Sequence, residues 1–148
     1  MTRWVRVMAL GVLAALALSA CGNAEGASTA QKENAQKADA ICEQTQDQVG
    51  TLGDDAAKDR DAVRSAAEKF AALKAPSENE TTWLEFERES DNLWMSLEDV
   101  AQARDPAVNE RARADRAITR VRDTNNRLAK LAQDYRMKEC NKGLGRNP

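Results

Sequence analysis

The 148-residue chain contains no histidine, and this absence excludes several catalytic chemistries at once. The serine and cysteine nucleophiles of hydrolases are commonly activated by a histidine base. Zinc and di-iron centres of helical proteins also draw on histidine ligands. A glycine-rich phosphate-binding loop is missing too. We therefore expect no catalytic residue, no metal and no noncovalent cofactor, and an enzyme is the least favoured class of function.

Glycine and proline are also scarce, with seven and three residues. Gly50, Gly53, Pro76 and Pro106 divide the body of the chain into four segments, because both residue types interrupt helices. The segments span about 30–50, 55–74, 78–104 and 106–140. In each segment apolar residues recur with the period of a helix, and no stretch alternates with the period of a strand. Asn125, inside the last apolar stripe, is interpreted as a buried polar residue that fixes helix register.

Capping residues predict where these helices begin and end. The expected signals are the capping box Ser77-x-x-Glu80, Asp105 before Pro106, Asp54 or Asp55 before the second helix, and Gly143 after the fourth. Four amphipathic helices with short connections predict an all-α, up-down-up-down four-helix bundle over residues 31–148. The main alternative is a three-helix fold in which the first two helices are fused through residues 50–53.

A single short hydrophobic run opens the chain. It covers about residues 7–18, follows Arg3 and Arg6, and is closed by the small residues Ser19 and Ala20. A transmembrane helix needs about 20 apolar residues, so this run is too short for a permanent span. A basic head, a short apolar run and small residues at its end are typical of a secretory signal peptide. Its removal at residue 20 would leave 128 of the 148 residues and change the net charge from −2 to −4.

The end of this run, Leu18-Ser19-Ala20-Cys21, resembles the lipobox of bacterial lipoproteins position for position. The resemblance implies cleavage between Ala20 and Cys21 and a diacylglycerol on the Cys21 thiol, with palmitate among the acyl chains. Two or more chains anchor a protein stably where one holds it only marginally. We expect a protein attached by lipid to the extracytoplasmic face of the cell membrane. Residues 21–30 are small and polar and are predicted to form a flexible tether.

The chain has only three cysteines, and lipidation of Cys21 would leave Cys42 and Cys140 as a pair. An exported protein meets an oxidising compartment, so we expect these two to form a disulfide. In the expected bundle, Cys42 lies in the first half of the first helix and Cys140 at the end of the fourth, and the two ends are neighbours. A redox-active pair is the alternative, which the absence of C-x-x-C spacing disfavours.

The mature region also resembles small helical lipoproteins and secreted proteins of high-GC Gram-positive bacteria, a largely uncharacterised family. The shared features are Ala40-Ile41-Cys42, the break Leu73-Lys74-Ala75-Pro76 before the third helix, and Cys140 after the last helix. Residues 136–139 depart from the family's usual Gly-Leu before the final cysteine. The resemblance implies a fold and a location, and no activity.

Charge is distributed unevenly along the chain. Residues 110–146 hold eleven Lys and Arg against five Asp and Glu, whereas the third segment is strongly acidic. One interpretation is that the third and fourth helices are antiparallel neighbours with complementary flanks. The other is that outward arginines, namely Arg116, Arg120 and Arg127, contact an anionic lipid or an envelope polymer. An export signal and a net negative charge argue against nucleic acid as a partner.

Leu84 and Met95 are eleven residues apart, three helical turns, and lie off the main apolar stripe of the third segment. They form either a second buried edge or an exposed patch for a partner. The leading hypothesis is a non-enzymatic, lipid-anchored module of the cell envelope that binds a protein partner or serves as a spacer. The alternative is a carrier of a small molecule or lipid in a cavity between the helices. A filled core with an exposed patch favours the first, and a large apolar cavity favours the second.

Overall fold

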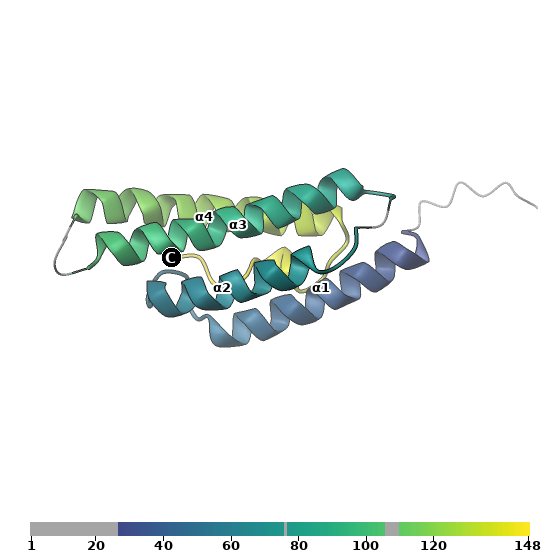
Figure 1. Ribbon diagram of the computed structural model, residues 1–148, viewed down its shortest axis with the longest axis horizontal. Helices are drawn as coiled ribbons and strands as arrows, with labels where there is room; N and C mark the ends of the chain where they lie inside the picture. Colours follow the sequence, from purple (N-terminus) through teal and green to yellow (C-terminus); the bar gives the residue numbers. More distant parts are fainter. Residues whose placement is uncertain (1–26, 76, 106–109) are drawn as a thin grey trace, which may run out of the picture.

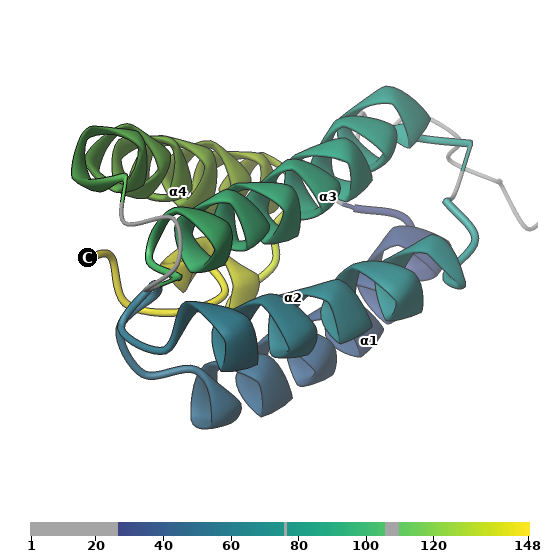
Figure 2. The ribbon, with the colours of Figure 1, turned by 60° about the vertical axis from the view of Figure 1, so that its left-hand side comes forward.

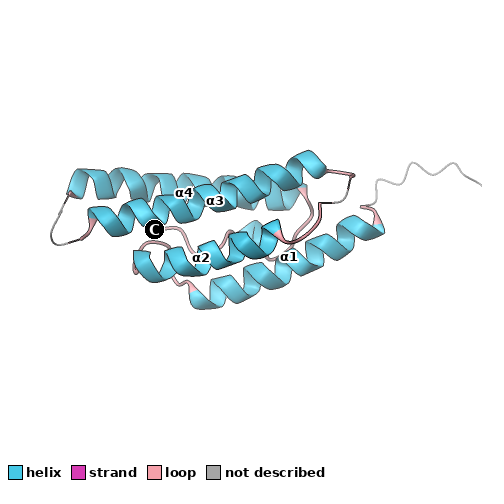
Figure 3. Ribbon diagram, in the orientation of Figure 1, coloured by secondary structure: helices cyan, strands magenta, loops and turns pink. Residues whose placement is uncertain are grey.

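Four helices follow one another in the order that the glycine and proline breaks predict. The computed structural model describes residues 27–75, 77–105 and 110–148. Its elements are α1 (Thr29–Gln48), α2 (Ala56–Ala71), α3 (Glu80–Ala103), α4 (Arg111–Asp134) and the short 3-10 helix η1 (Cys140–Lys142) (Figure 1). Within these ranges no strand is present, as Figure 3 shows. The predicted all-α bundle is confirmed, and the fused three-helix alternative is wrong.

The turn between α1 and α2 separates two helices because its backbone is tied down locally. Asp55 caps α2, its Oδ1 accepting from the Lys58 N–H at 3.3 Å. Gly53 has a φ of 89°, and a Cβ there would lie 2.7 Å from the Ile118 side chain. The Gly53 N–H donates to the Asp59 carboxylate at 2.8 Å. A continuous helix through this segment would have to give up these contacts.

The other helix boundaries differ from those that the capping signals predict. Asn79, the residue before α3, has a φ of 70° and makes no side-chain cap, so Ser77 and Glu80 do not form the expected capping box. The N–H of Asp105 donates to Gln102 O at 3.2 Å, and residues 106–109, which this aspartate is expected to cap, lie outside the described residues. α4 begins only at Arg111. At the other end of the molecule, Ser28 caps α1 by accepting from the Gln31 N–H, so the last two residues of the expected tether are helical.

α4 ends at Asp134, several residues before the predicted end. Arg136 has a φ of 66°. Its N–H donates to Gln133 O at 2.9 Å, and the Met137 N–H donates to Ala132 O at 2.8 Å. This pair of bonds is the Schellman pattern that closes many helices, here with arginine in the left-handed position that glycine usually occupies. The chain therefore turns back before Cys140, and Gly143 ends η1 instead of α4.

Residues 136–148, which we call the strap, return between α4 and α1. Figure 2 shows this segment in yellow, behind α3 and below α4. Among the described residues, no Cα atom of α1 comes within 8 Å of one in α4, whereas η1 contacts both helices. The Leu52 N–H donates to Arg146 O at 2.8 Å, and the Arg146 N–H donates to Gly50 O at 3.1 Å. The fourth seam of the bundle is thus made by an irregular segment.

An aromatic cluster fills the core at the end of the bundle where α1 begins and α4 ends. Phe70 of α2, Trp83 and Phe86 of α3 and Tyr135 after α4 are fully buried. Their ring centroids lie 4.9 to 6.4 Å apart. Such aromatic pairs contribute about 0.5–1.5 kcal/mol each beyond their burial. The apolar faces expected from the sequence therefore meet in one shared core.

Candidate interaction surfaces

The predicted lipid site lies outside the described residues. Cys21 and Ala20, with the rest of residues 1–26, are not described, so cleavage and lipidation stay predictions. Of the helices that the structure does describe, none combines the length and the apolar character needed to cross a bilayer.

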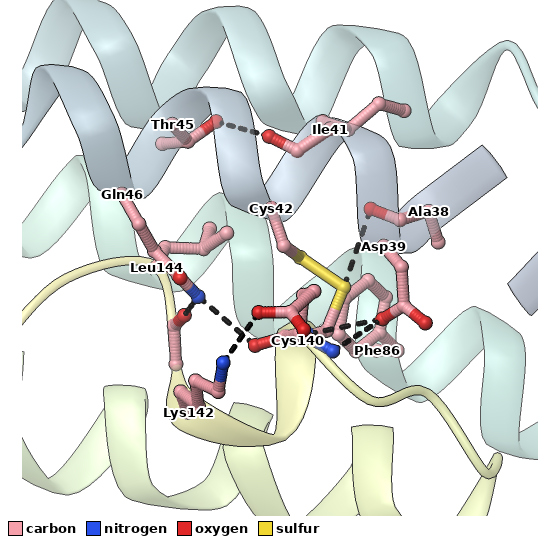
Figure 4. The surroundings of a disulfide bond; sticks show 12 residues. Ala38, Asp39, Ile41, Cys42, Thr45, Gln46, Phe86, Cys140, Lys142 and Leu144 are labelled. Carbon is pink, nitrogen blue, oxygen red and sulfur yellow. Dashed lines mark hydrogen bonds and ion pairs between the residues drawn. A yellow bond between two sulfur atoms is a disulfide. The ribbon is translucent and has the colours of Figure 1, made fainter. Parts of the chain in front are cut away.

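The disulfide joins α1 to the strap, as Figure 4 shows. Cys42 and Cys140 are both fully buried, and their Cα atoms are 5.2 Å apart. The predicted pairing is confirmed, but its placement differs. Cys42 lies in the second half of α1, and Cys140 lies in η1 beyond the end of α4. The bond therefore fixes the strap on α1 instead of joining two helix ends.

Polar side chains of α1 hold the strap backbone on either side of the disulfide. The Asp39 carboxylate accepts from the backbone N–H groups of Lys138 (2.9 Å), Glu139 (2.8 Å) and Cys140 (3.2 Å). Gln46 donates to the carbonyls of Glu139 at 2.9 Å and Gly143 at 2.6 Å. The sequence does not single out Asp39 or Gln46, because nothing local to them indicates the distant segment that they bind.

Asn125 of α4 is buried and makes hydrogen bonds to the strap backbone. Its Nδ2 donates to Gly145 O at 3.0 Å, and its Oδ1 accepts from the Leu144 N–H at 2.9 Å. Gly143 packs so closely that an added Cβ would lie 2.4 Å from Asn125 Oδ1. The expected helix-register role is therefore corrected, since this amide supplies the hydrogen bonds that a buried irregular backbone otherwise lacks.

Ion pairs line the seam between α3 and α4. Arg120 contacts Asp99 at 2.5 Å, Arg113 contacts the same carboxylate at 3.6 Å, and Arg127 contacts Glu89 at 3.1 Å. For Arg120 and Arg127 the structure thus bears out the interpretation of complementary neighbouring helices. Arg116 is exposed and has no ion-pair partner among the described residues.

Leu84 and Met95 are exposed, at 52% and 45% of their surface, so the second buried edge is wrong. Met95 lines a hollow of about 330 Å³ between α3 and α4, together with Asp99, Arg120 and Arg127. A second hollow of about 360 Å³, reached past Arg127, continues along the same two helices. The described part of α3 thus carries two exposed apolar side chains beside a charged groove.

Two carboxyl groups have a raised pKa. Burial raises the pKa of Asp59, although the Gly53 N–H opposes this change. Burial likewise raises the pKa of Glu87, to which the Trp83 indole N–H donates. One lies at the start of α2 and the other in the first half of α3, and α2 and α3 are antiparallel, so the structure does not bring them together. Among the described residues no cluster of three or more metal-ligating side chains occurs.

Comparisons of this chain with protein-family models, with curated proteins and with solved structures found no match. Its function is therefore inferred from the geometry of the bundle and from the N-terminal sequence.

Proposed function

We propose that this chain is a non-enzymatic, lipid-anchored protein of the cell envelope that binds a partner protein through the exposed face of α3. The observation that carries the proposal is the position of Leu84 and Met95. Two large apolar side chains are left in solvent on one helix, although the same helix buries Trp83, Phe86 and Leu93 completely. The anchor is supported by the lipobox resemblance at Leu18-Ser19-Ala20-Cys21.

The core favours a binding module over a carrier. The aromatic cluster fills the core at the end where α1 begins, and the fully buried Leu93, Leu97 and Leu128 continue the core beyond it. The hollows described above lie at the surface between helices and are lined by charged side chains. A carrier of an apolar ligand needs an apolar pocket that covers most of the ligand's surface.

The partner we expect presents an amphipathic helix to α3 and α4. Leu84 and Met95 are three turns apart, about 16 Å along the helix at 1.5 Å per residue. This spacing matches apolar anchors on a partner helix lying in the groove. Charges of both signs line the groove, including Arg88 and Glu85 of α3 and Lys130 of α4. These charges would set the direction in which the partner helix lies.

The anchor is tested by mass spectrometry of the protein isolated from its own membranes. We expect the wild type to carry a diacylglycerol on Cys21, and the Cys21→Ser variant to retain its first 20 residues and carry no lipid. A wild-type chain that is processed at another site, or that has a free Cys21 thiol, would contradict the anchored part of the proposal.

The binding face is tested by placing a photo-crosslinking residue at position 84 in cells. We expect one adduct with a partner protein, and we expect Met95→Glu to abolish it because a charge would be placed at the second anchor. The same crosslinker at Gln44, an exposed position on α1, serves as the matched control and should give no such adduct. An adduct that survives Met95→Glu, or one formed with a second copy of the chain, would refute the proposed partner.

A further inference from the structure

The strap carries a different set of charges from α4. Four basic residues, Arg136, Lys138, Lys142 and Arg146, are exposed along it. Lys142 pairs with Glu139, whereas Lys138 and Arg146 have no ion-pair partner among the described residues. The basic groups that face α3 are thus paired with its carboxylates, whereas Lys138 and Arg146 are presented to solvent where the strap meets α1. The outward face of α4 also presents exposed basic residues, Arg116 and Lys130 among them.

These basic groups gather beside the point where the described chain begins. Ala27, the first described residue, lines a hollow of about 310 Å³ together with Lys32, Arg136 and Lys138. A second hollow of about 330 Å³ lies further along the strap and includes Lys142 and Arg146. The basic surface therefore starts at the tether end of the bundle and runs along α1.

The length of chain before Ala27 keeps this surface close to the lipid site. Ala27 follows Cys21 by only six positions in the sequence. A fully extended chain spans about 3.3–3.6 Å per residue, so the hollow at Ala27 stays within about 20 Å of the lipidated residue. Electrostatic attraction extends about 10 Å at moderate salt. The short tether therefore lets this end of the bundle come within that distance of the lipid headgroups.

Acidic groups oppose the attraction only in part. Asp39, Glu43 and Glu139 lie near Lys142, and Glu139 pairs with it. α1 carries Glu33 and Asp47 as well, against Lys32 and Lys37. The strongly acidic helix lies elsewhere. α3 has seven acidic residues and one basic residue, and none of its Cα atoms is within 8 Å of one in α1 or η1. A negative surface would attract the strap side and repel the α3 side.

We infer that the strap face, formed by Lys32, Lys138, Lys142 and Arg146, docks on the anionic headgroups of the membrane that holds the lipid anchor. The inference rests on the lipid anchor of the proposed function. It assigns an orientation in which α1 and the strap lie along the bilayer and α3 points away from it. The face that carries Leu84 and Met95 is then presented to partners in the aqueous phase.

The test uses the mature lipidated protein, which begins at Cys21, reconstituted in vesicles, with lysine acylation read by mass spectrometry. Vesicles of phosphatidylglycerol and phosphatidylcholine in equal parts are compared with vesicles of phosphatidylcholine alone. We expect Lys32, Lys138 and Lys142 to be acylated several-fold more slowly on the anionic vesicles, and high salt to abolish the difference. Lys58, exposed at the start of α2, is the internal control and should react equally on both.

Matched variants separate a specific face from net charge. Each basic residue near an anionic surface strengthens binding about fivefold. Lys138→Gln with Arg146→Gln should therefore lower the equilibrium constant for docking by about 25-fold and expose Lys32 to acylation. Arg116→Gln with Lys130→Gln removes the same charge from α4 and should leave Lys32 protected.

Three outcomes would overturn the inference. Equal acylation on both vesicles, with the lipid on Cys21 confirmed by mass, refutes docking and leaves the anchor intact. Protection that appears only when soluble polyphosphate is added assigns the face to a polyanion instead of the bilayer. A wild-type chain without lipid refutes the docking and the proposed function together.

Discussion

The two seams that hold α4 in the bundle are built in different ways. On one side α4 packs directly against α3, and Arg120 and Arg127 pair with Asp99 and Glu89 across the contact. On the other side α4 does not reach α1, and the strap fills the space with backbone that makes hydrogen bonds to Asp39, Gln46 and Asn125. The first seam is made by helix faces, whereas the second combines backbone hydrogen bonds with the Cys42–Cys140 disulfide.

The two seams also differ in how their basic side chains are paired. In the α3–α4 seam, basic side chains are paired with acidic ones on the neighbouring helix. In the strap seam, the carboxylate of Asp39 is occupied by backbone N–H groups, so Lys138 on the strap is left without an ion-pair partner among the described residues. Basic residues of the C-terminal region thus form ion pairs between helices in the α3–α4 seam, and they are exposed to solvent in the strap seam.

The largest expected effect comes from removing the disulfide. Cys42→Ala with Cys140→Ala should lower the free energy of unfolding by about 4 kcal/mol, since the bond closes a loop with a sequence separation of 98. Urea unfolding measures the change. Reductant should shift the wild type by a similar amount and leave the double variant unaffected. A loss below about 1 kcal/mol would show that hydrogen bonds alone hold the strap.

Asn125→Ala probes the hydrogen bonds of the same seam. The variant leaves the Leu144 N–H and the Gly145 carbonyl buried without their partner, and we expect a loss of about 1–3 kcal/mol. The exposed neighbour Asn126→Ala is the matched control and should change stability by less than about 0.5 kcal/mol. Equal effects of the two variants in urea unfolding would show that the hydrogen bonds of Asn125 do not stabilise the strap seam.

A pH dependence is expected from Asp59, which binds the α1–α2 turn at the end of the strap seam. Because burial raises the pKa of Asp59 above its usual 3.8, the folded state binds the proton more tightly than the unfolded state. The resulting contribution to stability is fully present below pH 3.8 and is lost as the pH rises through the raised pKa. Asp59→Asn should flatten that part of the profile of unfolding free energy against pH. An unchanged slope would contradict the assignment.

The smallest effects belong to the ion pairs of the α3–α4 seam. Arg120→Gln and Arg127→Gln should each cost no more than about 1 kcal/mol, because these arginines are exposed. The loss should shrink further at high salt, whereas the loss from Asn125→Ala should persist. Arg116→Gln is the control without an ion-pair partner among the described residues. An ion-pair variant as damaging as Asn125→Ala would mean that the two seams do not differ as described.

Much of the fold follows from local patterns, and the errors share a cause. The stripe with Trp83, Phe86 and Leu93 predicted its buried face correctly, because helical periodicity records which side avoids water. The capping signal at Ser77 failed, since a cap depends on backbone conformation that distant contacts can override. The end of α4 failed for a similar reason, because the left-handed residue is Arg136 and not glycine.

The candidate surfaces divide in the same way. The sequence indicated that Leu84 and Met95 lie off the main stripe, but could not choose between burial and exposure, because that depends on what packs beside α3. It indicated the charge excess of residues 110–146, but not that α4 would pair its arginines with Asp99 and Glu89 while the strap kept its lysines exposed.

By itself the sequence determined the four helices and the apolar faces that form the core, because composition and period act locally along the chain. It also indicated the pairing of Cys42 with Cys140, because the lipobox resemblance sets the third cysteine, Cys21, aside. Only the tertiary structure decided that α4 stops early, that a strap replaces direct contact between α1 and α4, and which charges stay in solvent. These features depend on residues about a hundred positions apart, such as Asp39 and Cys140, whose contact no local pattern encodes.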